Sequence, residues 1–154
     1  STPLYSSAAS DVYKRQLTYL GQLRDNAGVT VVLTTHYMEE AERCDRIAIL
    51  HQGKIVRIGE PAALKAEVGG DVVVLQSQRP AALQASIRDR FGFDARLVDG
   101  TLRVERPRGH EFVRDVVDAF RDEITNVTFG KPTLEDVFVH ATGASFWDTP
   151  AVQA

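Results

Sequence analysis

The hydrophobic pattern divides the first half of the chain into a helix, a buried strand and a hairpin. Apolar residues between Leu17 and Ala27 recur at helical spacing before Gly28, which predicts a helix that stops at this glycine. Residues 29–35, VTVVLTT, are apolar or β-branched without alternation. Such a run predicts a strand buried on both faces, as in a parallel sheet that is covered by helices.

Residues 37–69 are predicted to hold two short helices and a hairpin. A short helix is expected over 37–44, and strands over 46–51 and 54–58 are joined at Gln52-Gly53, a pair typical of hairpin turns. Pro61 opens a second helix, since proline is favoured in the first turn. Gly69-Gly70 ends this helix and marks the expected domain boundary.

Residues 70–143 are predicted to form a small α+β domain. Strands are expected over 71–76, 95–98, 102–105 and 124–129, and helices over 80–91 and 111–120. Their order is strand, helix, strand, strand, helix, strand, which is the split βαβ arrangement of ferredoxin-like folds. A further short helix is expected over 132–140, and residues 144–154 are expected to be a loose tail.

Composition and charge exclude several classes of protein. The 154 residues include 18 Lys and Arg against 21 Asp and Glu, a net charge of −3, so no basic excess favours a nucleic-acid partner. The single cysteine, Cys44, excludes an internal disulfide, and it is expected to be a packed residue, not a nucleophile. The longest apolar runs are far shorter than the roughly 20 residues of a membrane-spanning helix.

The first sixteen residues, STPLYSSAASDVYKRQ, differ from the rest of the chain. They have neither the charge pattern of a signal peptide nor a sustained period, and they resemble a translated cloning adapter. We therefore expect residues 1–16 to be a non-native addition or a disordered tail, and we expect the natural protein to extend further upstream.

His36 is the candidate functional residue, because it follows the carboxyl end of a predicted buried strand, where open α/β sheets place ligand groups. Its imidazole is able to donate a hydrogen bond to a phosphate or to a water. The alternative is a histidine that caps the following helix. A metal site is disfavoured, because no second histidine follows at helical spacing, and Glu39, Glu40 and Glu42 are expected to form a solvated helix face.

No phosphate-binding loop of the form G-x-x-x-x-G-K-[ST] occurs in the chain. Gly53-Lys54 lacks the upstream glycine and is followed by Ile55. The phenylalanines are expected to be core residues, since basic residues do not alternate with them as they do in RNA-binding strands.

Four continuous blocks resemble the end of the ATP-binding subunit of an ABC transporter. They are TVVLTTHYMEEAE at 30–42, CDRIAIL at 44–50, GKIV at 53–56 and GEP at 59–61. Within this family the chain is most similar to drug- and antibiotic-export ATPases of the daunorubicin-resistance type. These carry an additional C-terminal domain that ends in a motif like PTLEDVFVH at 132–140.

The resemblance implies a fold and a site. Residues 17–69 would be the C-terminal remnant of a P-loop NTPase domain, and residues 70–143 would be the accessory ferredoxin-like domain. His36 would be the switch histidine of the H-loop, which contacts the γ-phosphate and helps to hold the hydrolytic water. The phosphate loop, the signature motif and the Walker B carboxylates of the family have no counterpart in this sequence.

The resemblance also implies partners. The intact protein would bind ATP and Mg²⁺, pair with a second ATP-binding subunit and drive a membrane-spanning permease from the cytoplasmic face of the membrane. The fragment alone is expected to bind no cofactor and to be inactive. Two alternatives stay open: a non-enzymatic ferredoxin-like regulatory or interaction module, and a metal-dependent hydrolase built on His36 with Glu39 or Glu40.

Overall fold

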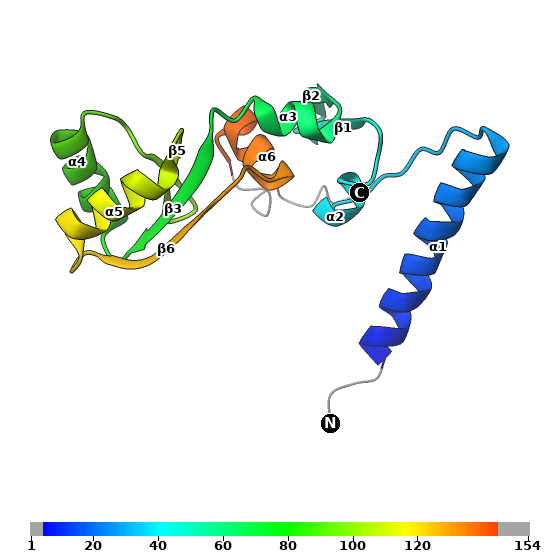
Figure 1. Ribbon diagram of the computed structural model, residues 1–154, viewed down its shortest axis with the longest axis horizontal. Helices are drawn as coiled ribbons and strands as arrows, with labels where there is room; N and C mark the ends of the chain where they lie inside the picture. The colour runs from blue at the N-terminus through cyan, green and yellow to red at the C-terminus, as the bar shows by residue number, and fades with distance from the viewer. Residues whose placement is uncertain (1–4, 145–154) are drawn as a thin grey trace. The chain divides into compact units, whose positions relative to one another are not determined.

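A computed structural model describes residues 5–144 of the chain, and the side chains of residues 11–144. The chain divides into two compact units, Ser1–His36 and Tyr37–Ala154 (Figure 1). The second unit contains a two-stranded and a four-stranded sheet, so the protein has a mixed α/β structure. The expected tail over 144–154 lies outside the described residues except for Ala144.

Helix α1, Tyr5–Ala27, dominates the first unit. It begins well before Leu17, because the small and polar residues that precede Leu17 are compatible with a helix although they show no apolar period. It ends as predicted at Gly28, whose φ of 64° leaves the helical region and whose N–H donates to the carbonyl of Arg24.

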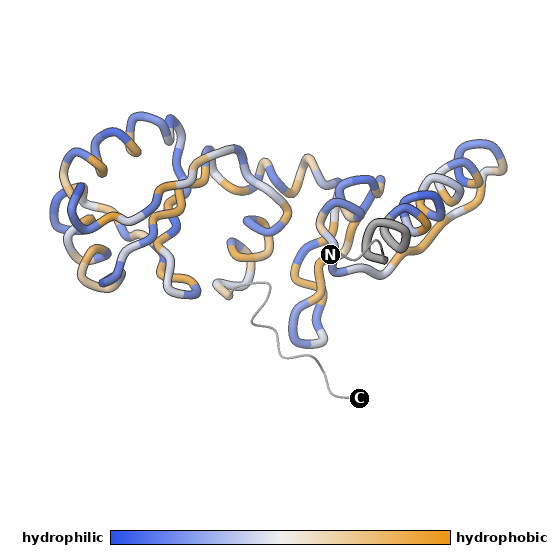
Figure 2. The backbone as a smooth tube through the Cα atoms, turned by 90° about the horizontal axis from the view of Figure 1, so that it is seen from below, coloured by the Kyte–Doolittle hydropathy of each residue, from blue (hydrophilic) through white to orange (hydrophobic). Residues whose placement is uncertain are grey.

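The prediction of a buried strand over residues 29–35 is wrong for this structure. The segment is extended but pairs with no strand, and Val32 is 90% exposed. Figure 2 colours much of this segment as hydrophobic, although it is open to solvent. A strand that is apolar on both faces needs neighbouring strands and covering helices, and the described chain provides neither for residues 29–35.

The second unit begins with a short helix and a hairpin. Helix α2 covers Met38–Ala41, and strands β1, Ile47–His51, and β2, Lys54–Gly59, pair antiparallel. Gln52 and Gly53 both have positive φ, which is the turn geometry that their residue types predicted. Helix α3, Pro61–Ala66, follows with Pro61 in its first turn. The predicted elements of residues 37–66 are therefore present.

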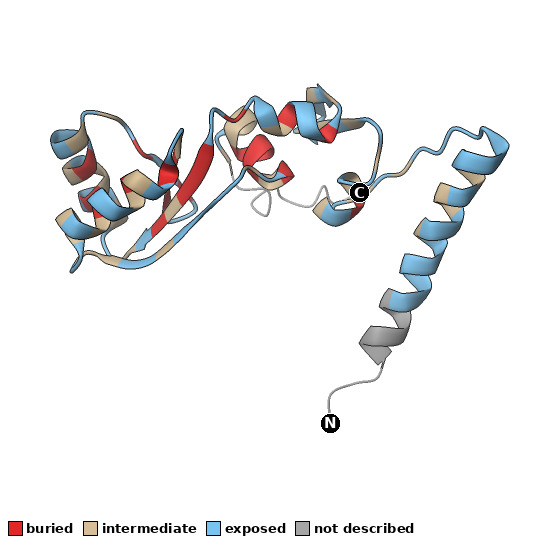
Figure 3. Ribbon diagram, viewed as in Figure 1, coloured by how far each residue is buried: buried red, intermediate tan, exposed pale blue. Residues whose placement is uncertain are grey.

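The four-stranded sheet has the order β4-β5-β3-β6, and every neighbouring pair is antiparallel. Its strands are β3, Asp71–Ser77, β4, Arg96–Val98, β5, Thr101–Arg106, and β6, Ile124–Gly130. Strand β3 lies between β5 and β6 in the sheet, and it is the most buried of the four strands (Figure 3).

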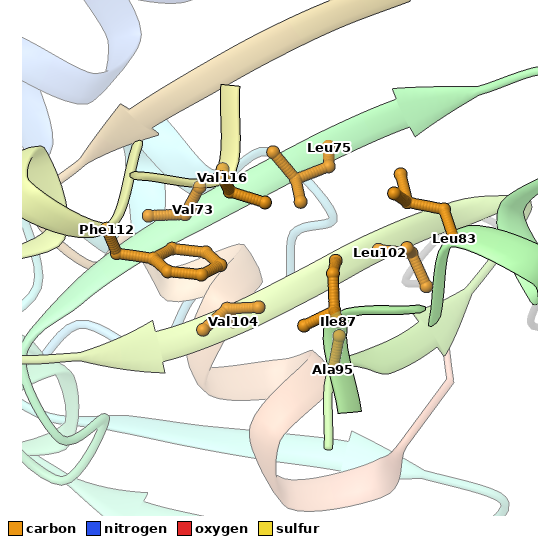
Figure 4. Close-up of a cluster of buried hydrophobic side chains, with 9 residues drawn as sticks. All are labelled: Val73, Leu75, Leu83, Ile87, Ala95, Leu102, Val104, Phe112 and Val116. Atoms are coloured by element: carbon orange, nitrogen blue, oxygen red, sulfur yellow. The ribbon is translucent and has the colours of Figure 1, made fainter. Parts of the chain in front are cut away.

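Helices α4, Pro80–Phe91, and α5, Gly109–Phe120, cover one face of this sheet. Figure 4 shows the core between them, in which Val73 and Leu75 of β3 and Leu102 of β5 meet Ile87 of α4 and Val116 of α5. These five side chains are fully buried. The bounds of α4 agree with the prediction, because Pro80 starts this helix and Gly92, with a φ of 73°, ends it.

Helix α6, Leu134–Thr142, belongs to a second apolar cluster against the opposite side of β3. The cluster joins Leu64 and Val68, which precede the predicted boundary at Gly69-Gly70, with Val72, Leu134 and Val137, which follow it. Residues on both sides of this boundary thus share one core. The division into 17–69 and 70–143 stays a prediction.

Candidate functional site

The predicted site residue, His36, ends the extended segment and lies two residues before α2. Its side chain is exposed. Helix α2 begins after Tyr37, which occupies the N-cap position without a side-chain capping hydrogen bond. The N-cap position of α2 therefore belongs to Tyr37 and not to His36.

The three glutamates that follow His36 differ in their surroundings. Glu39 is exposed, whereas Glu42 accepts a hydrogen bond from Lys65 of α3, with 2.7 Å between Oε2 and Nζ. Glu40 is only 7% exposed, so the expectation of a uniformly solvated face is wrong for this residue. The helix has a single turn and packs through Met38 and Ala41 against the cluster that contains Leu64, which carries the intervening Glu40 inward.

No group of three or more His, Cys, Asp or Glu side chains that would hold a metal ion occurs within the described part of the chain. Cys44 is partly buried, and its thiol donates to the carbonyl of Glu40 at 3.5 Å. His36 is therefore the residue of this predicted site that has to be tested.

The other histidines belong to helices and strands of the second unit. His51 of β1 packs edge-on against Phe138 of α6, with ring centroids 5.3 Å apart. His140 of α6 contacts Glu105 of β5, with 2.6 Å between Nδ1 and Oε2. His110 is exposed on α5, in a helix that begins earlier than predicted.

Arg96 of β4 completes the attachment of α6 to the sheet. Its Nη1 donates to the carbonyl of Val139 at 3.0 Å, in the last turn of the helix. A cation suits this position, because the last carbonyls of a helix lack partners within the helix and carry partial negative charge. His140 and Arg96 thus have structural contacts, and the sequence offered no local sign of them.

Asp71 is a buried carboxylate that sequence reasoning missed. One oxygen accepts from the N–H of Gly109 at 2.9 Å, and the other accepts from Lys131 Nζ at 2.6 Å. The hydrogen bond from Lys131, followed by that from Gly109, lowers the pKa of Asp71 below its usual value. The carboxylate therefore holds the start of α5 and the end of β6 against β3.

Two shallow hollows lie along α1 and are lined only by side chains of residues 11–22 of that helix. A hollow with one helix as its wall does not enclose a ligand. No helix in the described part of the chain is long and apolar enough to span a membrane.

Comparison with known proteins supplies the family. The chain is 34% identical over 128 residues to the daunorubicin resistance ATP-binding protein DrrA3 of Streptomyces coeruleorubidus, a match that covers 75% of this chain and 39% of that protein. It is 33% identical over 132 residues to the Nod factor export ATP-binding protein I of Burkholderia orbicola, covering 79% of this chain and 39% of that protein.

A shorter match with higher identity is to the probable multidrug ABC transporter ATP-binding protein YbhF of Escherichia coli. The two are 52% identical over 44 residues, which is 29% of this chain and 8% of that protein. No family model matches the chain.

These similarities place the chain among the ATP-binding proteins of ABC transporters, as its motifs predicted. Its relatives carry names of drug-resistance, Nod-factor-export and multidrug transport proteins. The chain spans about two fifths of the length of the first two relatives, 39% in each case.

Proposed function

We propose that the intact protein is the ATP-binding subunit of an ABC exporter, and that this chain is its C-terminal part. The observation that carries the proposal is the similarity of this chain, over 75% of its own length, to the daunorubicin resistance ATP-binding protein DrrA3. The subunit would couple ATP hydrolysis to export of a drug-like or antibiotic substrate. It would pair with a second ATP-binding subunit and act on a separate membrane permease from the cytoplasmic side.

His36 is proposed as the switch histidine of this subunit. Phosphoryl transfer depends mainly on positioning and on stabilisation of charge, so one well-placed hydrogen-bond donor changes the rate strongly. The exposure of His36 at the end of an apolar extended segment supports this role, because solvent and a nucleotide held by other residues are able to reach an exposed side chain. A neutral imidazole has one N–H donor and one acceptor, which suits contact with a phosphate oxygen or with a water.

The residues of this chain do not form an ATP site by themselves. The chain has two Gly-Lys pairs, and neither belongs to a G-x-x-x-x-G-K-[ST] motif. Gly53-Lys54 lies at the turn between β1 and β2, and Gly130-Lys131 lies at the end of β6 and is followed by Pro132, so neither pair makes a phosphate cradle. We infer that ATP and Mg²⁺ are held by residues of the intact protein outside this chain. The 154-residue chain is then expected neither to bind nor to hydrolyse ATP.

Exposed apolar residues before Gly69 support a larger ATP-binding domain. Val32 of the extended segment is 90% exposed, and Leu50, Ile55 and Ile58 of the hairpin are 53–63% exposed. In the register of the hairpin Leu50 faces Ile55, and Ile58 faces Ala48. Apolar surfaces of this kind mark contacts with further structure, here the remaining strands and helices of the proposed P-loop NTPase domain.

Residues 70–143 are proposed to be an accessory domain of the ferredoxin-like type. The strand order β4-β5-β3-β6 with two helices on one face supports this assignment. If the reading frame upstream of Leu17 lacks a glycine-rich phosphate loop, the regulatory or interaction module replaces the transporter subunit as the better proposal.

The test uses the intact protein, recovered by sequencing the reading frame upstream of residue 17. His36→Ala is expected to lower ATP turnover about 100-fold while ATP binding is retained, as expected for loss of one donor to the reacting phosphate. His110→Ala, which removes an exposed histidine from α5, is the matched control and is expected to leave turnover unchanged. Equal turnover in the His36 variant and the wild type would exclude the proposed role.

The 154-residue chain is tested separately by titration with ATP and Mg²⁺. We expect no binding at micromolar ATP. Micromolar binding that His36→Ala abolishes would overturn the proposal that the nucleotide is held by residues outside this chain.

A further inference from the structure

Strand β6 forms one margin of the four-stranded sheet, and within the described residues its outer edge pairs with no strand (Figure 1). The strand has 7 residues, and none of them is charged or a proline. A long free edge without charge or proline is a template for pairing with another strand, because its outward backbone N–H and C=O groups lack partners.

The opposite margin of the sheet does not offer such a template. Strand β4 has only 3 residues. Its first residue, Arg96, is charged and donates to the C-terminal end of α6. Short length and an edge charge both discourage pairing with another chain. The two margins therefore differ, and β6 is the one that is open to a partner.

An exposed aromatic side chain lies on the same strand. Phe129 is 52% exposed, although it stands opposite Val73, which is fully buried in the core beneath α4 and α5. Figure 3 shows most of β6 as exposed or partly exposed, in contrast to the neighbouring β3. A strand paired to the outer edge of β6 would cover part of the Phe129 ring and satisfy the free backbone groups.

The charges at the two ends of β6 are opposite in sign. Glu123 precedes the strand, Lys131 follows it, and the two are equally distant in sequence from Val127. If two copies of β6 pair antiparallel with Val127 opposite Val127, Glu123 of each copy faces Lys131 of the other. Lys131 already donates to Asp71, but its side chain is 86% exposed and its ammonium has three N–H groups.

We propose that this chain associates with a second copy of itself by antiparallel pairing of the two β6 edges, with Val127 at the two-fold axis. The same register places Thr128 opposite Asn126 of the second copy, a pair of polar residues able to hydrogen bond. The contact closes on itself, because a two-fold axis uses the same edge in both copies and leaves neither edge free. This inference does not rest on the proposed role in ATP hydrolysis.

The first experiment measures the mass of the full 154-residue chain by light scattering over a dilution series. A dimer is expected for the wild type. Thr128→Lys places a charge on the exposed strand edge and is expected to raise the dimer dissociation constant about tenfold or more. Ala85→Lys, which adds the same charge at an exposed position of α4, is expected to leave the dissociation constant unchanged.

The second experiment tests the register. A carbodiimide, which joins a carboxylate directly to an amine, is applied to a mixture of ¹⁴N- and ¹⁵N-labelled chains. We expect mixed-label peptides that join Glu123 to Lys131, and their loss in Glu123→Gln. Circular dichroism of each variant verifies that it is folded. A monomer at every concentration, a dimer that is insensitive to Thr128→Lys, or mixed-label crosslinks only between other residues would each overturn the proposal.

Discussion

Arg103 of β5 and Asp136 of α6 form an ion pair across the sheet–helix contact, with Nη1 and Oδ1 2.5 Å apart. The second carboxylate oxygen of Asp136 accepts from the N–H and the hydroxyl of Thr133, at 2.8 and 2.7 Å. Thr133 is the N-cap of α6, so Asp136 belongs to a capping box. One carboxylate therefore both starts the helix and attaches it to the sheet.

The PTLEDVFVH motif consequently has a structural explanation in this chain. Thr133 and Asp136 cap α6, and the buried Leu134, Val137 and Phe138 supply its apolar contacts. Two polar contacts join the helix to β5: His140 of α6 contacts Glu105, and Asp136 of α6 accepts from Arg103. The motif stabilises the position of α6 against the second face of the sheet.

Asp136→Ala is expected to lower the free energy of unfolding by about 2 to 4 kcal/mol, because it removes a helix cap and leaves the largely buried Arg103 guanidinium without its nearest partner. Glu135→Ala is the matched control. Its carboxylate is more exposed and lies 3.6 Å from Arg103, so a loss of about 0.5 kcal/mol or less is expected. Chemical denaturation of both variants provides the comparison. Equal losses would show that the capping box and the close ion pair contribute nothing specific.

Two adjacent glycines differ sharply in what they tolerate. Gly70 has a φ of 127°, and a Cβ added there would lie 2.6 Å from the backbone carbon of Arg106. At Gly69 an added Cβ would meet no atom within 4 Å. The difference arises because β5 ends beside Gly70, where β3 begins.

Gly70→Ala is expected to destabilise the protein by about 2 kcal/mol or more, since it combines an unfavourable backbone conformation with a clash against backbone atoms. Gly69→Ala is expected to change stability by no more than about 0.5 kcal/mol. Thermal unfolding of the two variants tests this contrast. A Gly70 variant as stable as the Gly69 variant would mean that the chain shifts here without cost.

Local signals in the sequence were sufficient for most of the second unit. Proline at a helix start, glycine after a helix end and the hairpin pair Gln52-Gly53 predicted where elements begin and end, because each acts through its own backbone conformation. In the structure Asp99 and Gly100, between β4 and β5, also both have positive φ. The order of strands and helices followed from these boundaries.

Contacts between distant residues were not predictable in the same way. Lys131 and Asp71 are 60 residues apart, and Arg103 and Asp136 are 33 apart, so no local pattern marks them as partners. The extended segment at 29–35 shows the opposite failure. Its composition predicts a buried strand, but burial depends on neighbouring strands that the described chain does not supply. The role of His36 was predicted from resemblance to a family, and its exposed position after the extended segment does not replace that argument.

Asp71 is expected to make stability depend on pH in the acidic range. Its hydrogen bonds to Lys131 and Gly109 lower its pKa in the folded protein below the ordinary value of 3.8. Between the lowered pKa and the ordinary one, the unfolded chain binds more protons than the folded protein, so stability rises with pH. The contribution of Asp71 is therefore complete above about pH 4 and is lost as the pH falls through the folded pKa.

Asp71→Asn is expected to be less stable than the wild type at pH 7, because the amide is neutral and its NH₂ cannot accept from either the Gly109 amide or the Lys131 ammonium. The difference between the two proteins should shrink as the pH falls below about 4, because Asp71 of the unfolded wild-type chain is protonated there before Asp71 of the folded protein. Urea denaturation from pH 7 to pH 3 measures it. Asp118→Asn, an exposed change on α5, should differ little from the wild type throughout this range. A stability difference at Asp71 that is constant with pH would show that the carboxylate acts through its shape alone and not through its charge.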